Sequence, residues 1–332
     1  MIEIPLITVI LPCYNASEYL HEALTSIVNQ TYTNLEILCI DDGSTDDTVN
    51  ILSSYEKEDN RIKIIRNEKN LKLIKTLNRG IELAKGDFIA RMDADDISEL
   101  NRIELLYQAL LSKKVDIVSC NFKFIDKNGA FYKSNFLKTI TQKEIFLASF
   151  FFTPIGHAML LGKTDVFRKN LYSINVNSIH TEDYELWTRM LRNQVYFYNL
   201  NKPLYQIRIN TESVSYKFES LQKQNFAICA KNHYERYFNK TVNQEIYNIV
   251  VNRFDKINAK NLNRAFALIE DIEQSIHNDS HIICELQRLD ILIQAFRKGS
   301  ISLKLKAGML LMSICLRNMF NSEFRKYLKT KF

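Results

Sequence analysis

The chain has 332 residues, 46% of them hydrophobic and 25% charged, which supports a sizeable folded core and excludes a disordered or fibrous protein. With 8 glycines, 4 prolines and no internal repeat, low-complexity linkers and repeat arrays are excluded as well. The net charge of +6 is uneven, because nine Lys/Arg and one acid (Glu323) lie between residues 291 and 332, which leaves −2 for the rest of the chain.

The first part of the chain alternates short apolar runs, rich in β-branched residues, with segments of helical periodicity. The runs predict strands at 6–12, 35–40, 61–66 and 86–92, and helices are expected at 17–29, 46–58, 71–84 and 99–112. This alternation is typical of βαβ units. It predicts an α/β fold with a mostly parallel sheet flanked by helices.

The pattern changes after residue 115. A strand and hairpin, a helix at 141–150, a strand at 158–162, a helix at 182–191 and strands at 195–199 and 203–209 are expected in turn. From Phe218 onward almost everything has helical periodicity. The sequence therefore predicts an α/β domain over residues 1–215 and a helical C-terminal region over residues 216–332.

The six cysteines are scattered, without a C-x-x-C pair, which favours buried reduced thiols and a cytoplasmic protein. No apolar stretch reaches the roughly 20 residues needed to cross a bilayer. The N-terminal segment MIEIPLITVILPCYN has no basic region or small-residue cleavage site, so we expect a first strand there and no signal peptide.

The first motif whose residues could bind a ligand is ILCIDDGSTDDT, in which Asp41 and Asp42 follow a predicted strand. Ligands of open α/β sheets bind beyond the carboxyl ends of the strands. A carboxylate there can accept hydrogen bonds from a nucleobase or from ribose hydroxyls. The alternative is that D-D-G-S serves only as a turn and helix cap.

The second motif is ARMDADD, which places three carboxylates in four positions after a buried-looking strand. Their mutual repulsion calls for a cation or for hydrogen-bond donors. Hard oxygen ligands suit Mg²⁺ or Mn²⁺, which bind few carboxylates together with substrate phosphates. The alternative is an acidic loop that caps the helix at 99–112.

The third motif is HTEDYELWTRML, with Glu182 and Asp183 at the start of a predicted helix. The positive end of a helix favours an ionised carboxylate. Such a carboxylate suits a general base that takes a proton from an attacking hydroxyl. An acidic cap on an amphipathic helix would have the same sequence, so both interpretations stay open.

Five segments occur in one order: V-I-L-P-C-Y-N, D-D-G-S-T-D-D-T, L-N-R-G-I, A-R-M-D-A-D-D and T-E-D-Y-E-L-W. Over residues 5–215 this order resembles the family 2 glycosyltransferases, inverting enzymes of the GT-A fold that commonly build bacterial surface polysaccharides. The resemblance implies a Rossmann-like, nucleotide-diphospho-sugar transferase fold. It also implies a metal-assisted transfer from a nucleotide-sugar donor.

The resemblance also implies a role for individual residues. The donor nucleotide would lie among Pro12, Tyr14, Asn15, Asp41, Asp42, Lys72, Asp93 and Ala94. Asp95, with Asp93, would bind the Mn²⁺ or Mg²⁺ on the diphosphate. Asp183 would be the catalytic base, while Glu182, Trp187 and, in the P-I-G-H segment, His157 would contact the acceptor.

Family habit implies a UDP-hexose or UDP-N-acetylhexosamine donor. The acceptor would be a hydroxyl of a growing, lipid-linked or oligosaccharide glycan of O-antigen, capsule or lipooligosaccharide type. A single displacement, with Asp183 as base, would turn an α-linked donor into a β-linked product. This points to an enzyme peripheral to the cytoplasmic face of the inner membrane.

Three positions depart from the family pattern. Relatives often have N-x-G where this chain has Asn70-Leu71-Lys72, so Lys72 replaces a glycine and either reaches the diphosphate or is solvated. Asn210 stands where relatives often carry a histidine, which leaves Arg208 or a loop residue to assist the metal or the diphosphate. Leu100 replaces a common proline, and no catalytic consequence is expected.

The basic tail, residues 297–332, contains an apolar stretch from Ala307 to Leu316 that is too short to span a membrane. A basic amphipathic helix can lie on an anionic membrane surface. It can equally pack on the catalytic domain with a solvated basic face. Because no recognition motif accompanies the charge, nucleic acid is not an expected partner.

Two other functions fit the sequence less well. A sugar-nucleotide nucleotidyltransferase needs a Gly-rich phosphate loop near the first strand, and LPCYNASEYL has none. A catalytically inactive GT-A-like binding or scaffold protein would not be expected to keep every acidic motif. The absence of G-x-G-x-x-G after the first strand argues against a dinucleotide-dependent oxidoreductase.

Overall fold

The computed structural model describes residues 4–135, 139–209, 218–254, 256–276, 281–298, 300–318 and 321. The chain forms two compact units, and each is described by itself. The first consists of Met1–Ile145 and Pro154–Glu219, and the second of Phe146–Thr153 and Ser220–Phe332. The short segment Phe146–Thr153 belongs to the second unit, whereas the sequence predicted one boundary between the two parts, at residue 215.

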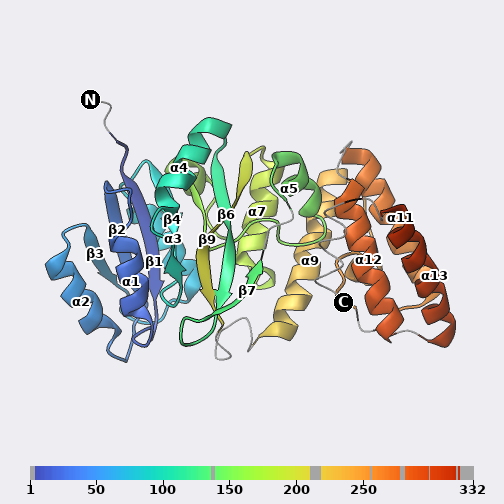
Figure 1. Ribbon diagram of the computed structural model, residues 1–332, viewed down its shortest axis with the longest axis horizontal. Helices are drawn as coiled ribbons and strands as arrows, with labels where there is room; N and C mark the ends of the chain where they lie inside the picture. Colours follow the sequence, from blue (N-terminus) through green and yellow to red (C-terminus); the bar gives the residue numbers. More distant parts are fainter. Residues whose placement is uncertain are drawn as a thin grey trace. The chain divides into compact units, whose positions relative to one another are not determined.

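In the part of the first unit that the structure describes, nine strands form one sheet (Figure 1). They are β1 (Ile7–Cys13), β2 (Leu35–Asp41), β3 (Ile62–Arg66), β4 (Phe88–Arg91), β5 (Ile97–Ser98), β6 (Ile117–Ile125), β7 (Phe131–Asn135), β8 (Leu161–Lys163) and β9 (Phe197–Arg208). Their order is β3-β2-β1-β4-β8-β6-β9-β5, and β7 pairs with β6.

The strands β1 to β4 are mutually parallel, and β1 lies between β2 and β4. The chain thus builds outward from β1 to β3 and then returns to the other side of β1. Such a reversal of strand order leaves a crevice at the carboxyl ends of the strands. The antiparallel pairs β4–β8 and β6–β8, with the parallel pair β6–β9, extend the sheet beyond this point.

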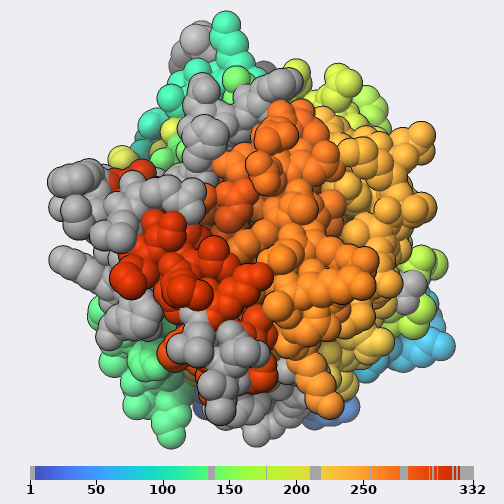
Figure 2. Space-filling model, turned by 90° about the vertical axis from the view of Figure 1, so that its right-hand side faces the viewer, coloured from blue at the N-terminus to red at the C-terminus, as the bar shows by residue number. Residues whose placement is uncertain are grey.

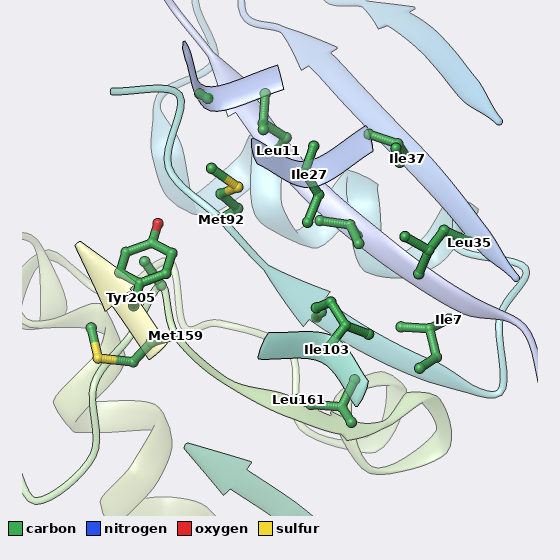
Figure 3. Packing of buried hydrophobic residues seen from close by; sticks show 14 of the residues in the cluster. Ile7, Leu11, Ile27, Leu35, Ile37, Met92, Ile103, Met159, Leu161 and Tyr205 are labelled. Carbon is green, nitrogen blue, oxygen red and sulfur yellow. The ribbon is translucent and has the colours of Figure 1, made fainter. Parts of the chain in front are cut away.

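Helices cover both faces of this sheet. They are α1 (Leu20–Val28), α2 (Thr48–Glu58), α3 (Leu73–Leu83), α4 (Arg102–Lys113), α6 (Thr164–Lys169) and α7 (Glu182–Arg192), while α5 (Gln142–Ala148) begins in the first unit and ends in the second. Alternate residues of β1 point to opposite faces. Ile7 and Leu11 join one buried cluster with Ile27 of α1 and Ile103 of α4 (Figure 3).

The helix α3 packs against the other face of the sheet. A β-carbon built on Gly80 would lie 2.8 Å from side-chain atoms of Ile10 and of Ile40, so a larger residue there would have to displace these isoleucines. This close approach places the first residues of α3 beside the ends of β1 and β2.

The fold class predicted from the sequence is confirmed: a mostly parallel sheet with flanking helices, followed by a helical region. Two details differ. The strands expected at 195–199 and 203–209 are one strand, β9, whose register shifts opposite Cys120 and Asn121 absorb the turn-like residues around Pro203. The short elements β5 and α6 were not expected, because two to six residues give no measurable periodicity.

The second unit is helical. It contains α9 (Glu219–Phe238), α10 (Gln244–Val250), α11 (Ala259–Ile276), α12 (His281–Lys298) and α13 (Ile301–Arg317). The Phe146–Thr153 segment belongs here because the ring of Phe150 stacks on His233 at 4.3 Å and its carbonyl accepts a hydrogen bond from Tyr247. None of the described helices is long and apolar enough to cross a bilayer.

The helices α12 and α13 lie side by side, as the orange and red atoms in Figure 2 show. Phe296, Met309 and Met312 are exposed large apolar residues on this pair. Part of the basic tail, including residues 322–332, lies outside the described residues, so the interpretation of the tail stays a prediction.

Candidate functional site

A pocket of about 460 Å³ lies at the carboxyl ends of the parallel strands of the first unit. The end of β1 and the loop after it form one wall, from Pro12 to Ala16 with Glu18 and Tyr19. Asp42, Asn70 and the first turn of α3 form a second wall, and Asp93, Ala94 and Asp95 a third. The pocket therefore occupies the place that the reversal of strand order provides.

The loop after β1 is anchored to the start of α2. The Asn15 N–H donates to the Ser44 hydroxyl at 3.0 Å, and the Asn15 side-chain oxygen accepts from the Thr45 N–H at 2.8 Å. Asn15 has φ 47°, a left-handed conformation that asparagine tolerates. Tyr14 is 50% exposed at the pocket. Its ring is available to a flat partner such as a nucleobase, while Asn15 shapes the loop.

The two acids at the end of β2 are both buried, and their carboxylates accept internal hydrogen bonds. Asp41 is 3% exposed, does not line the pocket, and accepts from the Ser44 N–H at 3.1 Å. Asp42 lines the pocket, but its oxygens accept from Asn67 at 2.7 Å, from the Leu71 N–H at 2.8 Å and from the Lys72 N–H at 2.9 Å. Asp41 thus supports a turn, and Asp42 holds the loop before α3; that the two acids bind the nucleotide stays a prediction.

The three acids after β4 have different surroundings. Asp93 receives two hydrogen bonds from the buried Arg91, at 2.5 and 3.2 Å, and its own N–H donates to the Tyr205 hydroxyl at 3.0 Å. Burial and the charge of Asp93 raise the pKa of Asp95 to about 6. Asp96 is 4% exposed and accepts from the Arg208 N–H at 2.9 Å. Asp93 and Asp95 face the pocket, and Asp96 belongs to the core.

This donor set can be tested against a divalent cation. No group of three or more His, Cys, Asp or Glu residues that could hold a metal ion is found among the residues that the structure describes. Asp93 and Asp95 alone line the pocket with hard carboxylate oxygens after β4. Mg²⁺ and similar ions commonly take one or two protein carboxylates and complete their shell with substrate phosphates and water. The residues present fit a cation of that kind.

Arg208 is not available to assist a metal or a diphosphate. It is 4% exposed, and its guanidinium donates to the backbone oxygens of Asp95, Asp126 and Lys127 and to the Glu22 carboxylate at 2.8 Å. The role considered for Arg208 is therefore wrong, because its donors are used within the fold. Asn210 lies outside the described residues.

Glu182 and Asp183 are half-buried at the start of α7. Asp183 accepts a hydrogen bond from the Tyr184 N–H at 2.7 Å. Burial, followed by the charge of Glu182, raises the pKa of Asp183 to about 7. Burial also raises the pKa of Glu182. A carboxylate with a pKa near neutrality is suited to proton transfer.

His157 donates or accepts a hydrogen bond with the Tyr172 hydroxyl at 2.8 Å. Burial, with the nearby charge of Arg91, lowers the pKa of His157 well below its usual range. Tyr172 is fixed to α3, because its backbone exchanges two hydrogen bonds of 2.9 Å with the Asn78 side chain. His157 is therefore a neutral ring held in one place.

Trp187 has no exposed surface, and its expected contact with the acceptor stays a prediction. Its ring lies edge-on to His157 and to Phe197, each at 6.1 Å between centroids. Its indole N–H has no hydrogen-bond partner within the described part of the chain. The side chain supports His157 from the core.

Arg91 and Tyr172 were not singled out in the sequence, although both lie within or between the motifs. Arg91 is 5% exposed and pairs with Asp93, and its charge acts on Asp95, Asp183 and His157. A signal for Arg91 existed, because residues two apart at the end of a strand point to the same side. Tyr172 had no such signal, since its partners are distant in the chain.

The chain is similar to known glycosyltransferases. The model of glycosyl transferase family 2 matches residues 8–172. An uncharacterized glycosyltransferase of Haemophilus influenzae is 35% identical over 204 residues, which are 57% of this chain and 61% of the relative. The O-antigen biosynthesis glycosyltransferase WbnJ of Escherichia coli is 32% identical over 212 residues, 63% of this chain and 81% of WbnJ. The chain thus spans less than two thirds of the first of these two relatives.

A third relative has a more specific name. The UDP-Glc:alpha-D-GlcNAc-diphosphoundecaprenol beta-1,3-glucosyltransferase WfgD of Escherichia coli is 29% identical over 221 residues, 66% of this chain and 83% of WfgD.

Two solved structures share the fold. S. aureus TarS 1-349 in complex with UDP-GlcNAc has a TM-score of 0.55 at 17% identity, covering 87% of each chain. The mannosyltransferase PcManGT from Pyrobaculum calidifontis, in complex with GDP-Man and Mn²⁺, has a TM-score of 0.52 at 16% identity, covering 98% of this chain and 84% of that one.

Proposed function

The chain belongs to glycosyl transferase family 2, and we propose that it transfers a sugar from a nucleoside-diphosphate donor to a hydroxyl of a growing surface glycan. One observation carries this proposal: the pocket at the reversal of strand order brings Tyr14, Asp93 and Asp95 onto its walls. An aromatic ring and two adjacent carboxylates are suited to a base at one end and a cation-bound diphosphate at the other.

The donor proposed is a UDP-hexose or a UDP-N-acetylhexosamine. Support comes from TarS, whose structure contains UDP-GlcNAc, and from WfgD, which is named for UDP-Glc. Tyr14 would stack on the base, and Pro12 and Asn15 would shape the loop around it. Asp42 would act through the loop that it holds, with at most one further hydrogen bond available to the ribose.

Asp95, together with Asp93, is proposed to bind a Mn²⁺ or Mg²⁺ ion. PcManGT, whose structure contains Mn²⁺, supports this choice of ion. A bound ion of this kind neutralises charge that develops on the departing nucleoside diphosphate. Ala94 lies between the two acids on the pocket wall, and its small side chain would let the donor approach the loop closely.

Asp183 is proposed to be the catalytic base. Its carboxylate takes the proton of the acceptor hydroxyl, and the hydroxyl oxygen forms a bond to the anomeric carbon from the face opposite the diphosphate. The bond from that carbon to the diphosphate oxygen breaks, and the nucleoside diphosphate leaves with the electron pair. Because this is a single displacement, an α-linked donor gives a β-linked product.

The acceptor is proposed to be lipid-linked, by similarity to WfgD, whose printed acceptor is a GlcNAc-diphosphoundecaprenol. Glu182 precedes Asp183 in the chain. His157 is hydrogen-bonded to Tyr172, which lies close enough to Asp183 and Glu182 for their charges to act on it. Both Glu182 and His157 would contact the acceptor sugar. The enzyme would then work at the cytoplasmic face of the inner membrane. The exposed Phe296, Met309 and Met312 of α12 and α13, with the basic Arg297 and Lys298 that follow Phe296 in the chain, suit an anionic membrane surface.

A donor panel tests the proposal. The purified chain is incubated with UDP-, GDP- and dTDP-sugars, Mn²⁺ and a GlcNAc-diphospholipid, and the released nucleotide is measured. We expect release of a nucleoside diphosphate that Asp183→Asn reduces by at least ~100-fold. Release of pyrophosphate would indicate a nucleotidyltransferase, and no turnover with any donor would favour an inactive binding protein.

The membrane role needs its own measurement. Wild type and a Met309→Ser/Met312→Ser variant are sedimented with anionic liposomes and, as a control, with neutral ones. We expect the wild type to pellet with anionic liposomes and the variant to remain in the supernatant. Equal pelleting of the two proteins would show that these methionines do not form the membrane surface.

A further inference from the structure

Lys72 has a backbone conformation that is unusual for any residue with a side chain. It has φ 71° and ψ 159°. This region is essentially restricted to glycine, because a β-carbon crowds the neighbouring peptide groups there. Asn15, the other non-glycine residue of the pocket with positive φ, is of a type that tolerates the left-handed region. The lysine is therefore under a strain that the surrounding structure must maintain.

Hydrogen bonds on both sides of Lys72 maintain this conformation. Its N–H donates to the Asp42 carboxylate at 2.9 Å and to the Asn70 side-chain oxygen at 3.0 Å. Its carbonyl accepts from the Thr76 N–H at 3.1 Å, as the first bond of α3. The other oxygen of Asp42 accepts from the Leu71 N–H. The backbone is thus held in place independently of the lysine side chain.

The charge of the pocket walls makes this lysine distinctive. Glu18, Asp42, Asp93 and Asp95 contribute four carboxylates, and Lys72 is the one cationic residue that lines the described pocket. The lysine is exposed, and its ammonium makes no hydrogen bond or ion pair with the residues that the structure describes. Elsewhere on the walls, negative charge would repel the phosphates of a nucleotide.

We infer that Lys72 binds the diphosphate of the donor, and that its strained backbone is retained because it turns this side chain toward the pocket. With positive φ, the β-carbon lies on the side of the chain where a residue with negative φ carries its α-hydrogen. An ammonium and a phosphate form a charge-assisted hydrogen bond. The inference rests on the proposed donor-binding role of the pocket and adds a specific contact to it.

The strain and the charge can be separated by substitution. Lys72→Met keeps a long side chain and the strained backbone but removes the charge. Lys72→Arg keeps the charge, and Lys72→Gly removes both charge and strain. Lys75→Met is the matched control, because Lys75 is exposed on the same helix but does not line the pocket.

The experiment measures binding of UDP and of uridine by titration calorimetry with Mn²⁺ present, and the melting temperature of each variant. We expect Lys72→Met and Lys72→Gly to weaken UDP binding about tenfold while uridine binding is unchanged. Lys72→Arg should stay within about threefold of the wild type for UDP. Lys72→Gly alone should melt about 2–6 °C higher than the wild type, because the strain is relieved.

Different failures have different meanings. If the wild type binds UDP but Lys72→Met and Lys72→Gly bind it equally well, the diphosphate contact is wrong and the proposed function stands. If Lys72→Gly melts at or below the wild-type temperature, the backbone conformation of Lys72 does not lower the stability of the protein, and the claim that a strained backbone is retained for binding is wrong. If the wild type binds none of UDP, GDP and dTDP, the proposed function itself fails, and this inference with it.

Discussion

Arg91 and Asp93 form a two-pronged ion pair at the end of β4, with nitrogen–oxygen distances of 2.5 and 3.2 Å. The Arg91 side chain is 6% exposed and the Asp93 side chain 34% exposed, and of the two only Asp93 lines the pocket. The pair orients Asp93 before any ligand arrives. It leaves Asp95 as the acid of this loop with the greater freedom to bind a cation.

Removing the cation of this pair should destabilise the protein. Arg91→Met leaves Asp93 beside Asp95 and Asp96 without its partner, and an uncompensated buried charge is costly. Because Asp93 is partly exposed, we expect a loss of about 2 kcal/mol, smaller than for a fully buried pair. Urea unfolding at pH 7.5 measures this. Arg91→Lys is the control and should recover part of the loss; equal stability of Arg91→Met and wild type would contradict the role.

Asp95 should control the metal dependence of donor binding. We expect Asp95→Asn to reduce UDP affinity in Mn²⁺ to the level that the wild type shows in EDTA, because a carboxylate ligand is lost. Titration calorimetry with and without Mn²⁺ measures the difference. Glu68→Gln, a change of an exposed acid outside the pocket, is the control. UDP binding by the wild type that does not depend on metal would contradict the assignment.

Transfer should become faster as the pH rises through neutrality. Asp183 must be ionised to accept a proton, and its pKa is raised to about 7 by burial and by Glu182. Below pH 7 the rate is expected to fall about tenfold per pH unit, and above about pH 8 it should be constant. A kcat/KM profile from pH 5.5 to 9 tests this. A rate independent of pH between 5.5 and 7 would show that Asp183 is not the base.

Asp183 should lower the free energy of unfolding at a pH where its side chain is ionised. The folded state holds the Asp183 proton more tightly than the unfolded state, so stability is lost as the pH rises from about 4 to about 7. Asp183→Asn removes this buried charge. We expect the variant to be more stable than the wild type by about 1–2 kcal/mol at pH 8, although it is inactive. Denaturant unfolding of both proteins at pH 8 and pH 4.5 measures the difference in their free energies of unfolding. If the variant is more stable by the same amount at pH 4.5, ionisation of Asp183 is not the cause.

Trp187 should behave as a core residue. Trp187→Phe keeps an aromatic ring and loses no hydrogen bond, since the indole N–H has none in the described structure. We expect a stability loss of about 1–3 kcal/mol and an acceptor KM within about twofold of the wild type. Thermal unfolding and transfer kinetics measure the two effects. A large rise in acceptor KM without loss of stability would instead indicate direct contact with the acceptor.

Much of the architecture could be predicted from local patterns. Apolar runs and helical periodicity gave the order of β1 to β4 and of α1 to α4. Because ligands of open α/β sheets bind beyond the carboxyl ends of the strands, the acids at the ends of β2 and β4 were expected to serve a ligand site. Asp42, Asp93 and Asp95 do line one pocket, and their roles there stay predictions.

The hydrogen-bond partners of individual polar side chains could not be predicted from local patterns. Asp42 holds the segment from Asn67 to Lys72, and Arg208 reaches Glu22, which is 186 positions away in the chain. Such partners are brought together only by the assembled sheet, so no local pattern reveals them. The Trp187 pattern likewise fits an exposed or a buried helix face equally well.

The sequence by itself determined the kind of protein and the residues available for chemistry, because strand and helix periodicity and acid clusters are local properties. Only the tertiary structure decided which of those residues remain free to act. Asp41, Asp96 and Arg208 have their hydrogen-bonding groups engaged inside the fold, and Lys72 has a strained backbone with an unpaired charge at the pocket. The physical reason is that availability depends on partners distant in the chain, and folding alone sets their positions.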